Sequence, residues 1–481
     1  MPREIVLIQP AMGRFEQVLG NVIEPLGLLC ASRLALEHFP VTLLDQRVER
    51  SFFTVLRRAL CRKPLLVGIT SSAGSQLAHA LEIARYVKAR SAVPVVFGGP
   101  FASQAPDEFL AEPSVDLVVA GEGEEALLGL ARVLDAGGNP RDVPGVFDRE
   151  GGRHPDHSLD LDALPPIPWH LLRSRRYFVH TFGRKTVSLE TTRGCPHACG
   201  YCYNTVVHRS RWRAMSAERS LEAVGHAIRS TGASQVYFTD DNFFVDRNRA
   251  FAIVKGLKDL GVDWAVQGVC VEDVVRMSDA DLDLLGESGC QGLFIGIQSG
   301  SERLQRMFHT SLDLAAVEPM NRRLAAARVP VWYFFMCGFP TETREDLQRT
   351  VSLAGRLLAD NPHAVTSAFF LATPYPGTAL HAKALEYGWP PRLGLEGWAR
   401  TGWSRGQVPW LSEEHRKLVE ALYFLSLFHD RKAERFGVVP PIRAFARFYR
   451  PLASYRLQHL DLRWFAGENW IRKLAFQAYL A

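Results

Sequence analysis

The sequence predicts an α/β protein: a doubly wound parallel sheet, then a partial (β/α)6 barrel, then a helical C-terminal region. Three observations support this. β-Branched runs alternate with helical patterns from residue 4 to about 135, a second alternation fills 187–390, and the remaining pattern is helical. We expect domains at 1–140, 187–390 and 391–481, joined by a Gly/Pro-rich linker at 141–186.

Composition limits the possible partners. A chain of 481 residues suits two or three domains, and a net charge of +5 gives no sign of a nucleic-acid partner. The N-terminus lacks the pattern of a signal peptide, and no apolar run is long enough to span a membrane. We therefore expect a cytoplasmic protein without a transmembrane segment.

In the first region, small residues follow the predicted strands 65–70, 94–99 and 116–121; two further strands are expected at 4–9 and 41–44. Ligands of doubly wound sheets bind beyond the carboxyl ends of the strands. The candidate ligand-binding residues there are Thr70, Ser71, Ser72, Gly98, Gly99, Pro100, Gly121 and Glu122.

The second region predicts six strands that alternate with helices. This alternation predicts an open relative of the (β/α) barrel, with its active site at the C-terminal strand ends. The expected strands are 186–192, 235–240, 263–268, 292–298, 331–337 and 364–371, and the helices are 216–231, 246–260, 279–288, 313–328 and 343–359.

A cysteine motif, TTRGCPHACGYCYN, follows the first strand of that region with the spacing C-x3-C-x2-C. Three thiolates in one loop are able to hold three irons of a cubane and leave the fourth iron open. The alternative is a zinc site with His197 or His208 as the fourth ligand. The other five cysteines are scattered in apolar surroundings, which indicates metal binding in a reducing compartment.

CPHACGYC resembles the signature of radical S-adenosylmethionine (SAM) enzymes, and the strings FTDDNFF, FIGIQSGSERLQRM, FFMCGFPTET and ATPYPGTAL follow in that superfamily's order. The resemblance implies a 4Fe-4S cluster on Cys195, Cys199 and Cys202. It implies SAM-binding roles for Tyr201, Asp240, Asp241, Gln298 and Ser299. On sequence alone, capping of the following helix is the stronger expectation for one of the two aspartates.

The first region resembles the Rossmann-like cobalamin-binding domain that precedes many radical SAM cores. The matching strings are IEPLGLLCASRL, GITSSAGSQLAHALEIAR, VVFGGPFASQAPDEFL and DLVVAGEGEEAL, which makes the strand-end residues above a candidate cobalamin site. The family's D-x-H-x-x-G motif is absent, because QPAMGRFEQ has no histidine to ligate cobalt from below. A structural domain without cobalamin is the alternative.

The combined resemblance implies a cobalamin-dependent radical SAM methyltransferase acting on an unactivated carbon of a small-molecule, natural-product or lipid-like substrate. The cluster would reduce SAM to a 5′-deoxyadenosyl radical that takes a hydrogen from the substrate, and methylcobalamin would deliver the methyl group. A flavodoxin or ferredoxin is the expected electron donor. The expected substrate pocket contains Tyr333, Met336 and Tyr375, and no catalytic acid or base is identified.

Three other functions remain possible. A cyclase, oxidase or rearranging enzyme would share the architecture without methyl transfer, and a scaffold protein would keep only a degenerate core. A tRNA methylthiolase is disfavoured, because only Cys30 and Cys61 are available for a second cluster. The aromatic and Arg-rich tail, 443–481, suits peripheral membrane contact or simple packing on the barrel.

Overall fold

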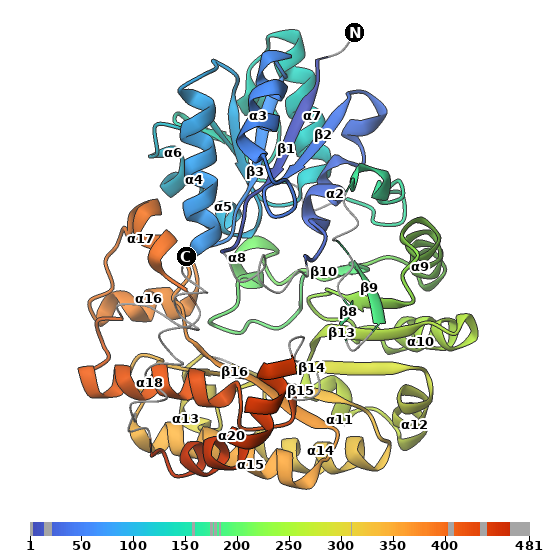
Figure 1. Cartoon of the computed structure of the whole chain (residues 1–481), viewed down its shortest axis with the longest axis vertical. Coiled ribbons are helices and arrows are strands. Elements are labelled where there is room, and N and C mark those ends of the chain that lie inside the picture. The colour runs from blue at the N-terminus through green and yellow to red at the C-terminus, as the bar shows by residue number, and fades with distance from the viewer. Residues whose placement is uncertain are drawn as a thin grey trace.

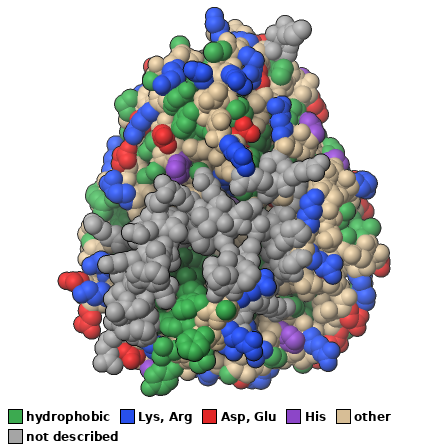
Figure 2. Space-filling model, in the orientation of Figure 1, with side chains coloured by type: hydrophobic (Ala, Val, Ile, Leu, Met, Phe, Trp, Pro, Cys, Tyr) green, Lys and Arg blue, Asp and Glu red, His purple; other side chains and the backbone are tan. Residues whose placement is uncertain are grey.

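Two α/β units and a set of C-terminal helices make up the computed structural model (Figure 1). The structure describes residues 3–13, 22–155, 159–173, 177, 180–181, 184–308, 310–402, 408–432 and 440–461. Within these ranges, every helix is too short or too polar to cross a membrane. Where Figure 2 colours the surface by side-chain type, basic side chains are scattered rather than gathered in one stripe.

The first sheet has the order β2-β1-β3-β4-β5-β6-β7, and β1 to β5 are parallel. This confirms the predicted doubly wound sheet. The strands are apolar because helices cover both faces of the sheet. The parallel strands are β1 (Ile5–Gln9), β2 (Val41–Asp45), β3 (Leu66–Thr70), β4 (Val95–Gly98) and β5 (Leu117–Val119), and the helices are α2 (Leu26–Ser32), α3 (Phe52–Cys61), α4 (Ser75–Lys88), α5 (Pro100–Gln104), α6 (Pro106–Leu110) and α7 (Gly123–Ala136).

The segment expected to be a linker differs in part from the prediction. It contributes β6 (Val146–Asp148) and β7 (Gly151–Gly152), which extend the first sheet in antiparallel fashion. Strands of two or three residues are too short to show an alternating pattern, so the sequence gives no sign of them.

The second sheet has the order β16-β15-β14-β13-β12-β9-β8, and all but β8 run parallel to their neighbours. This confirms the partial barrel. Its strands are β8 (His180–Thr181), β9 (Arg184–Leu189), β12 (Gln235–Phe238), β13 (Asp263–Val269), β14 (Cys290–Gln298), β15 (Val331–Cys337) and β16 (Ala364–Leu371), and its main helices are α9 (Ala217–Thr231), α10 (Arg247–Leu260), α12 (Asp279–Glu287), α14 (Leu314–Ala326) and α15 (Arg344–Asp360).

The open edge of the barrel at β16 is covered by α18 (Glu413–Ser426) and the residues after it. Asp430 Oδ2 accepts a hydrogen bond from Thr366 N at 2.7 Å, and Ser426 Oγ accepts one from Phe369 N at 3.0 Å. Side chains of the C-terminal region therefore take the place of a further strand, which protects an exposed sheet edge.

The C-terminal region also reaches back to the first sheet through α17 (Gly394–Arg400), which packs on α4 (Figure 1). The Trp398 carbonyl accepts a hydrogen bond from Gly74 N at 3.0 Å. The Trp398 and Phe101 rings lie 5.1 Å apart, and Arg85 pairs with Glu396 at 2.8 Å. The C-terminal region thus contacts both α/β units.

The first part of the aromatic tail forms α20 (Pro440–Gln458), which packs against α15 and α18. Its exposed Phe448, Leu452 and Tyr455 recur at helical spacing along one face. The rest of the tail, 462–481, lies outside the described residues, and peripheral membrane contact stays a prediction.

Candidate active site

A cavity of about 260 Å³ lies between the two α/β units. Its walls come from the carboxyl ends of β3, β4 and β5 on one side and from the segment that carries the cysteine motif on the other. The first unit contributes Gly27, Thr70, Gly98, Gly99, Pro100, Gly121 and Glu122 among others, and the second contributes Glu190, Arg193, Tyr203, Val207 and His208.

Six of the eight residues predicted to bind cobalamin line this cavity; Ser71 and Ser72 do not. Ser72 donates from both N and Oγ to Gln76 Oε1, at 2.7 and 2.8 Å, and Ser71 is fully buried. These two hydroxyl side chains therefore stabilise their own turn at the start of α4. Sequence reasoning did not distinguish this role from ligand binding, because both use small polar residues after a strand.

Glycines shape the cavity. Gly99 has φ +96°, and a Cβ there would lie 2.7 Å from Thr70 Oγ1. A Cβ on Gly27, by contrast, would meet no atom within 4 Å, because the position faces open space. Small residues at the strand ends thus leave room for a planar group to approach the backbone closely, which fits the nucleotide tail of cobalamin.

The family's histidine that ligates cobalt from below is missing from the sequence motif, and among the described residues no histidine of the first unit lines this cavity in its place. Among the residues that line it, the one histidine is His208, which belongs to the second unit. Its Nδ1 lies 3.8 Å from Glu122 and its Nε2 lies 3.8 Å from Asp241. His208 therefore faces carboxylates, so it is not placed as the fourth ligand of a zinc site on the cysteine loop.

A buried charge network crosses the boundary between the units and centres on Arg193. Arg193 pairs with Glu122 at 2.9 Å, with Glu124 at 2.6 Å and with Glu190 at 3.1 Å. Burial raises the pKa of Glu124, but the charge of Arg193 and its hydrogen bond lower it more, so that the net shift is downward. Glu124 is consequently ionised at neutral pH.

Asp241 organises the start of the cysteine loop. Its Oδ2 accepts a hydrogen bond from Gly194 N at 2.8 Å, and its Oδ1 accepts one from the Tyr203 hydroxyl at 2.5 Å. Gly194 has φ +81°, and a Cβ there would lie 1.8 Å from the Arg211 carbonyl oxygen, so that only glycine fits. Asp241 thereby ties both ends of the loop to the strand end after β12.

Asp240 lies deeper and accepts hydrogen bonds from Thr191 N at 3.1 Å and Thr191 Oγ1 at 2.8 Å. Burial raises its pKa to about 6. The helix that follows is capped instead by Asp246, whose side chain accepts from Arg249 N. Neither Asp240 nor Asp241 caps that helix; Asp241 holds the cysteine loop, and Asp240 holds Thr191 just before it.

The three loop cysteines are buried or half-buried. Cys202 N donates to the Cys199 carbonyl at 3.0 Å, which turns the loop back on itself. Burial raises the pKa of Cys199, and raises that of Cys202 to about 12, while a hydrogen bond with Cys270 lowers the pKa of Cys195 to about 7. Three thiols from one shielded loop suit an iron-sulfur cluster.

Sequence reasoning missed Cys270. The Sγ atoms of Cys195 and Cys270 and a ring nitrogen of His197 all lie within 4.8 Å of one another, a group that does not include Cys199 or Cys202. Cys270 directly follows β13, and that position at the C-terminal edge of the barrel was the available signal.

The predicted SAM-binding residues Gln298 and Ser299, at the end of β14, have different surroundings from Tyr201 on the cysteine loop. Gln298 ends β14 with φ +64°, and Ser299 Oγ lies 3.2 Å from Thr350 Oγ1 in a buried contact. Tyr201 packs in a small apolar cluster that also contains Met336. The cluster's buried members are Leu304, Phe308, Phe339, Ala372 and Leu380.

The prediction that Tyr333 lines the substrate pocket is wrong. Tyr333 is fully buried, and its hydroxyl donates to Asn321 Oδ1 on α14 at 2.9 Å, so it faces the outer helices. Side chains alternate along β15, which places Met336 on the opposite face. Tyr375 stacks on Trp398, with the ring centroids 6.1 Å apart.

Half-buried aromatic side chains gather on the face of the barrel sheet opposite Tyr333. The ring of Phe294 lies 5.4 Å from Trp332, 5.8 Å from Phe334 and 5.4 Å from Tyr237, and Phe334 lies 6.2 Å from Phe370. Sequence reasoning missed this surface, although the period of two along VWYFFMC already separated Trp332 and Phe334 from Tyr333.

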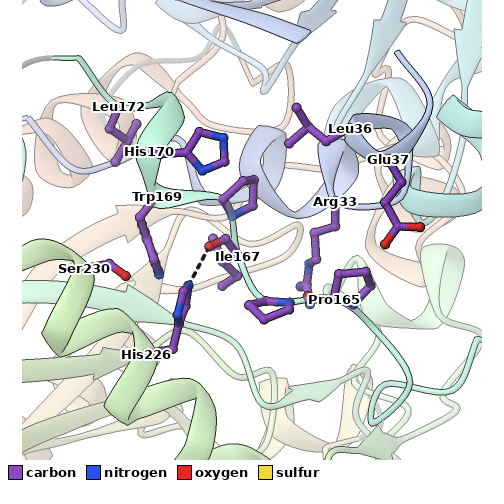
Figure 3. Close-up of a pocket in the computed structure, with 12 residues that line it drawn as sticks. Arg33, Leu36, Glu37, Pro165, Ile167, Trp169, His170, Leu172, His226 and Ser230 are labelled. Atoms are coloured by element: carbon purple, nitrogen blue, oxygen red, sulfur yellow. Dashed lines mark hydrogen bonds between the residues drawn. The ribbon is translucent and has the colours of Figure 1, made fainter. Parts of the chain in front are cut away.

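A second cavity, of about 660 Å³, is formed by residues 165–170 and Leu172 together with α9 and residues 33–37, which follow α2 (Figure 3). His226 Nε2 lies 3.1 Å from the Ile167 carbonyl oxygen at its edge. Its lining contains no cysteine and no residue predicted for a cofactor. This cavity is therefore separate from the candidate active site.

Family comparisons agree with both halves of the chain. Residues 189–354 match the radical SAM superfamily, and residues 17–131 match the B12 binding domain. An uncharacterized methyltransferase of Pyrococcus horikoshii is 28% identical, over 79% of this chain and 83% of that protein. An anaerobic magnesium-protoporphyrin IX monomethyl ester cyclase of Synechocystis sp. is 26% identical, over 65% of this chain and 64% of that protein.

Solved structures share the fold. The cobalamin-dependent SAM radical enzyme OxsB, with aqua-cobalamin and SAM bound, matches with a TM-score of 0.72 and 14% identity, over 95% of this chain and 72% of that chain. The radical SAM methyltransferase TsrM of Kitasatospora setae, with cobalamin and a 4Fe-4S cluster bound, matches with a TM-score of 0.65 and 20% identity, over 80% of this chain and 75% of that chain. The chain therefore contains a region of the radical SAM superfamily, residues 189–354, preceded by a B12 binding domain, residues 17–131.

Proposed function

We propose that the chain is a cobalamin-dependent radical SAM methyltransferase that acts on an unactivated carbon of a small-molecule, natural-product or lipid-like substrate. One observation carries this proposal. The strand ends of the B12-binding domain and the segment that bears the cysteine motif line the same cavity. A methyl carrier and a radical source serve one reaction only when they lie this close together.

In this proposal Cys195, Cys199 and Cys202 hold the 4Fe-4S cluster. SAM contacts Tyr201, Asp240, Asp241, Gln298 and Ser299, and cobalamin lies in the cavity bordered by Gly99 and Gly121. When bound, the cluster supplies an electron to SAM and cobalamin supplies a methyl group. The division into domains at 1–140, 187–390 and 391–481 belongs to the same proposal, and the segment 141–186 that joins the first two also lends β6 and β7 to the first sheet.

The protein's own part is to position these groups and to exclude water. Asp241 and Gly194 fix the start of the cysteine loop. Arg193 fixes that loop against Glu122 and Glu124 of the B12-binding domain. Because these contacts are buried, they keep the distance between the two cofactor sites constant while the site is closed to solvent.

The half-buried aromatic face around Phe294, Trp332 and Phe334 supports an apolar or planar substrate. TsrM, which shares the fold, has been solved with a tryptophan substrate. A flavodoxin or ferredoxin in the cytoplasm completes the proposal as the electron donor.

The test is anaerobic reconstitution with iron and sulfide, with and without hydroxocobalamin, followed by assay of SAM cleavage under a strong reductant. We expect bound corrin in the absorption spectrum and formation of both 5′-deoxyadenosine and S-adenosylhomocysteine. Turnover that is indifferent to cobalamin and yields no S-adenosylhomocysteine would contradict methyl transfer.

The similarity to the magnesium-protoporphyrin cyclase supports a second candidate, a radical SAM cyclase of the same architecture. The product separates the two candidates once a substrate is found. A methyltransferase adds one carbon to the substrate, whereas a cyclase leaves the carbon count unchanged.

A further inference from the structure

Cys270 lies beside the cysteine loop, although it belongs to a different part of the barrel. It follows β13 directly, at the carboxyl edge of the sheet where the loop after β9 also lies. Its Sγ is within 4.8 Å of the Cys195 Sγ. The proposed cluster leaves one iron without a protein ligand, and Cys270 is a further thiol beside the same loop.

Asn242 gives a second, independent observation at this pair of sulfur atoms. The residue is fully buried, and its Nδ2 donates to Cys270 Sγ at 3.3 Å and to Cys195 Sγ at 3.8 Å. Its Oδ1 is buried and has no hydrogen-bond partner among the described residues. Amide N–H groups directed at two sulfur atoms are the arrangement expected around metal-bound thiolates.

The other cysteines outside the loop have different surroundings. Cys290 and Cys337 are buried in the hydrophobic core, Cys30 lies against Arg33 in the first unit, and Cys61 is exposed at the end of α3. In the part of the chain that the structure describes, only Cys270 shares a hydrogen-bond donor with a cysteine of the motif. The position of Cys270 is therefore specific to the cluster loop.

We propose that Cys270 is an exchangeable fourth cysteine ligand of the cluster, bound to the otherwise open iron until SAM arrives. The inference rests on the proposed function, since it requires the cluster on the loop. In the exchange, the bond between iron and the Cys270 sulfur breaks and the thiolate takes up one proton. The ammonium group of SAM releases one proton, and the resulting amine takes the iron position, so that charge is balanced without oxidation or reduction.

A fourth ligand changes how the cluster responds to mild oxidation. A cubane with an open iron loses that iron on oxidation, and becomes a paramagnetic 3Fe-4S cluster, more readily than a cubane held by four thiolates. We would reconstitute the wild type, Cys270→Ala, Cys270→Ser and the control Cys61→Ala anaerobically as full-length chains. Ferricyanide is then added without SAM, and the 3Fe-4S signal is quantified by electron paramagnetic resonance alongside iron and sulfide content.

We expect a severalfold larger 3Fe-4S signal in Cys270→Ala than in the wild type and Cys61→Ala, and we expect SAM to suppress it. Mössbauer spectra of wild type with labelled iron should show a distinct iron site only after SAM is added. Equal signals in wild type and Cys270→Ala would overturn the inference while leaving the proposed function intact. So would loss of all iron from both folded Cys270 variants, because the ligand would then be essential rather than exchangeable. A folded wild type that takes up no iron contradicts the proposed function itself.

Discussion

Arg193 Nη2 donates to Glu124 Oε1 over 2.6 Å, and this nearly fully buried ion pair joins the segment before the cysteine motif to the first helix turn after β5. Glu122, two residues earlier, pairs with the same guanidinium. The two cofactor-binding units therefore meet through charges that are shielded from solvent, where a missing partner is costly.

Removal of one partner should destabilise the junction strongly. In Glu124→Gln the buried positive charge of Arg193 loses one of the negative charges that balance it. We therefore expect the free energy of unfolding to fall by about 3 kcal/mol, the scale of a broken buried ion pair. Urea denaturation measures this directly. Glu125→Gln, the exposed neighbour on the same helix, is the matched control and should behave as wild type.

The same pair predicts a dependence of stability on pH. The pKa of Glu124 is lowered from its ordinary value of 4.5 in the folded chain, so its contribution is present above that value and is lost as the pH falls through the folded pKa. Thermal melts should show a steeper loss of stability below about pH 4.5 in wild type than in Glu124→Gln. Parallel curves for the two proteins would exclude Glu124 as the titrating group.

Gly27 offers a test of the cobalamin cavity that spares the fold. Because a Cβ at this position meets no atom within 4 Å, Gly27→Ala should fold at least as well as wild type. In Gly27→Leu the longer side chain enters the cavity, and we expect bound cobalamin per chain, measured by absorbance after gel filtration, to drop severalfold. Full retention of corrin by Gly27→Leu would place the cofactor elsewhere.

Tyr333 should behave as a structural residue. Tyr333→Phe deletes the hydroxyl that donates to Asn321, and Asn321 Oδ1 keeps a second donor in Asn361 at 3.0 Å. We expect a loss of about 1 kcal/mol in stability, with unchanged 5′-deoxyadenosine formation by the reconstituted enzyme. A fall in that rate without a change in stability would instead support the original prediction that Tyr333 lines the substrate pocket.

The regular elements were predictable because their signals are local. The apolar runs that become β1 to β5 and the barrel strands lie within single windows of the chain, and so does the spacing of Cys195, Cys199 and Cys202. Cys270, Arg193 and Asn242 were not predicted, because their roles arise from contacts between residues far apart in sequence. Tyr333 was misassigned although local alternation along β15 contained the answer.

The contact between α17 and α4 has a mechanical consequence. The first unit is joined to the barrel by the connecting segment and by the Arg193 network, and Trp398 and Glu396 hold it at a further place through Gly74 and Arg85. A body fixed at several separate points does not swing about a single hinge. Any widening of the gap between the two sheets must therefore break the contacts of α17 with the first unit. This short helix thus helps to keep the cavity between the two α/β units closed.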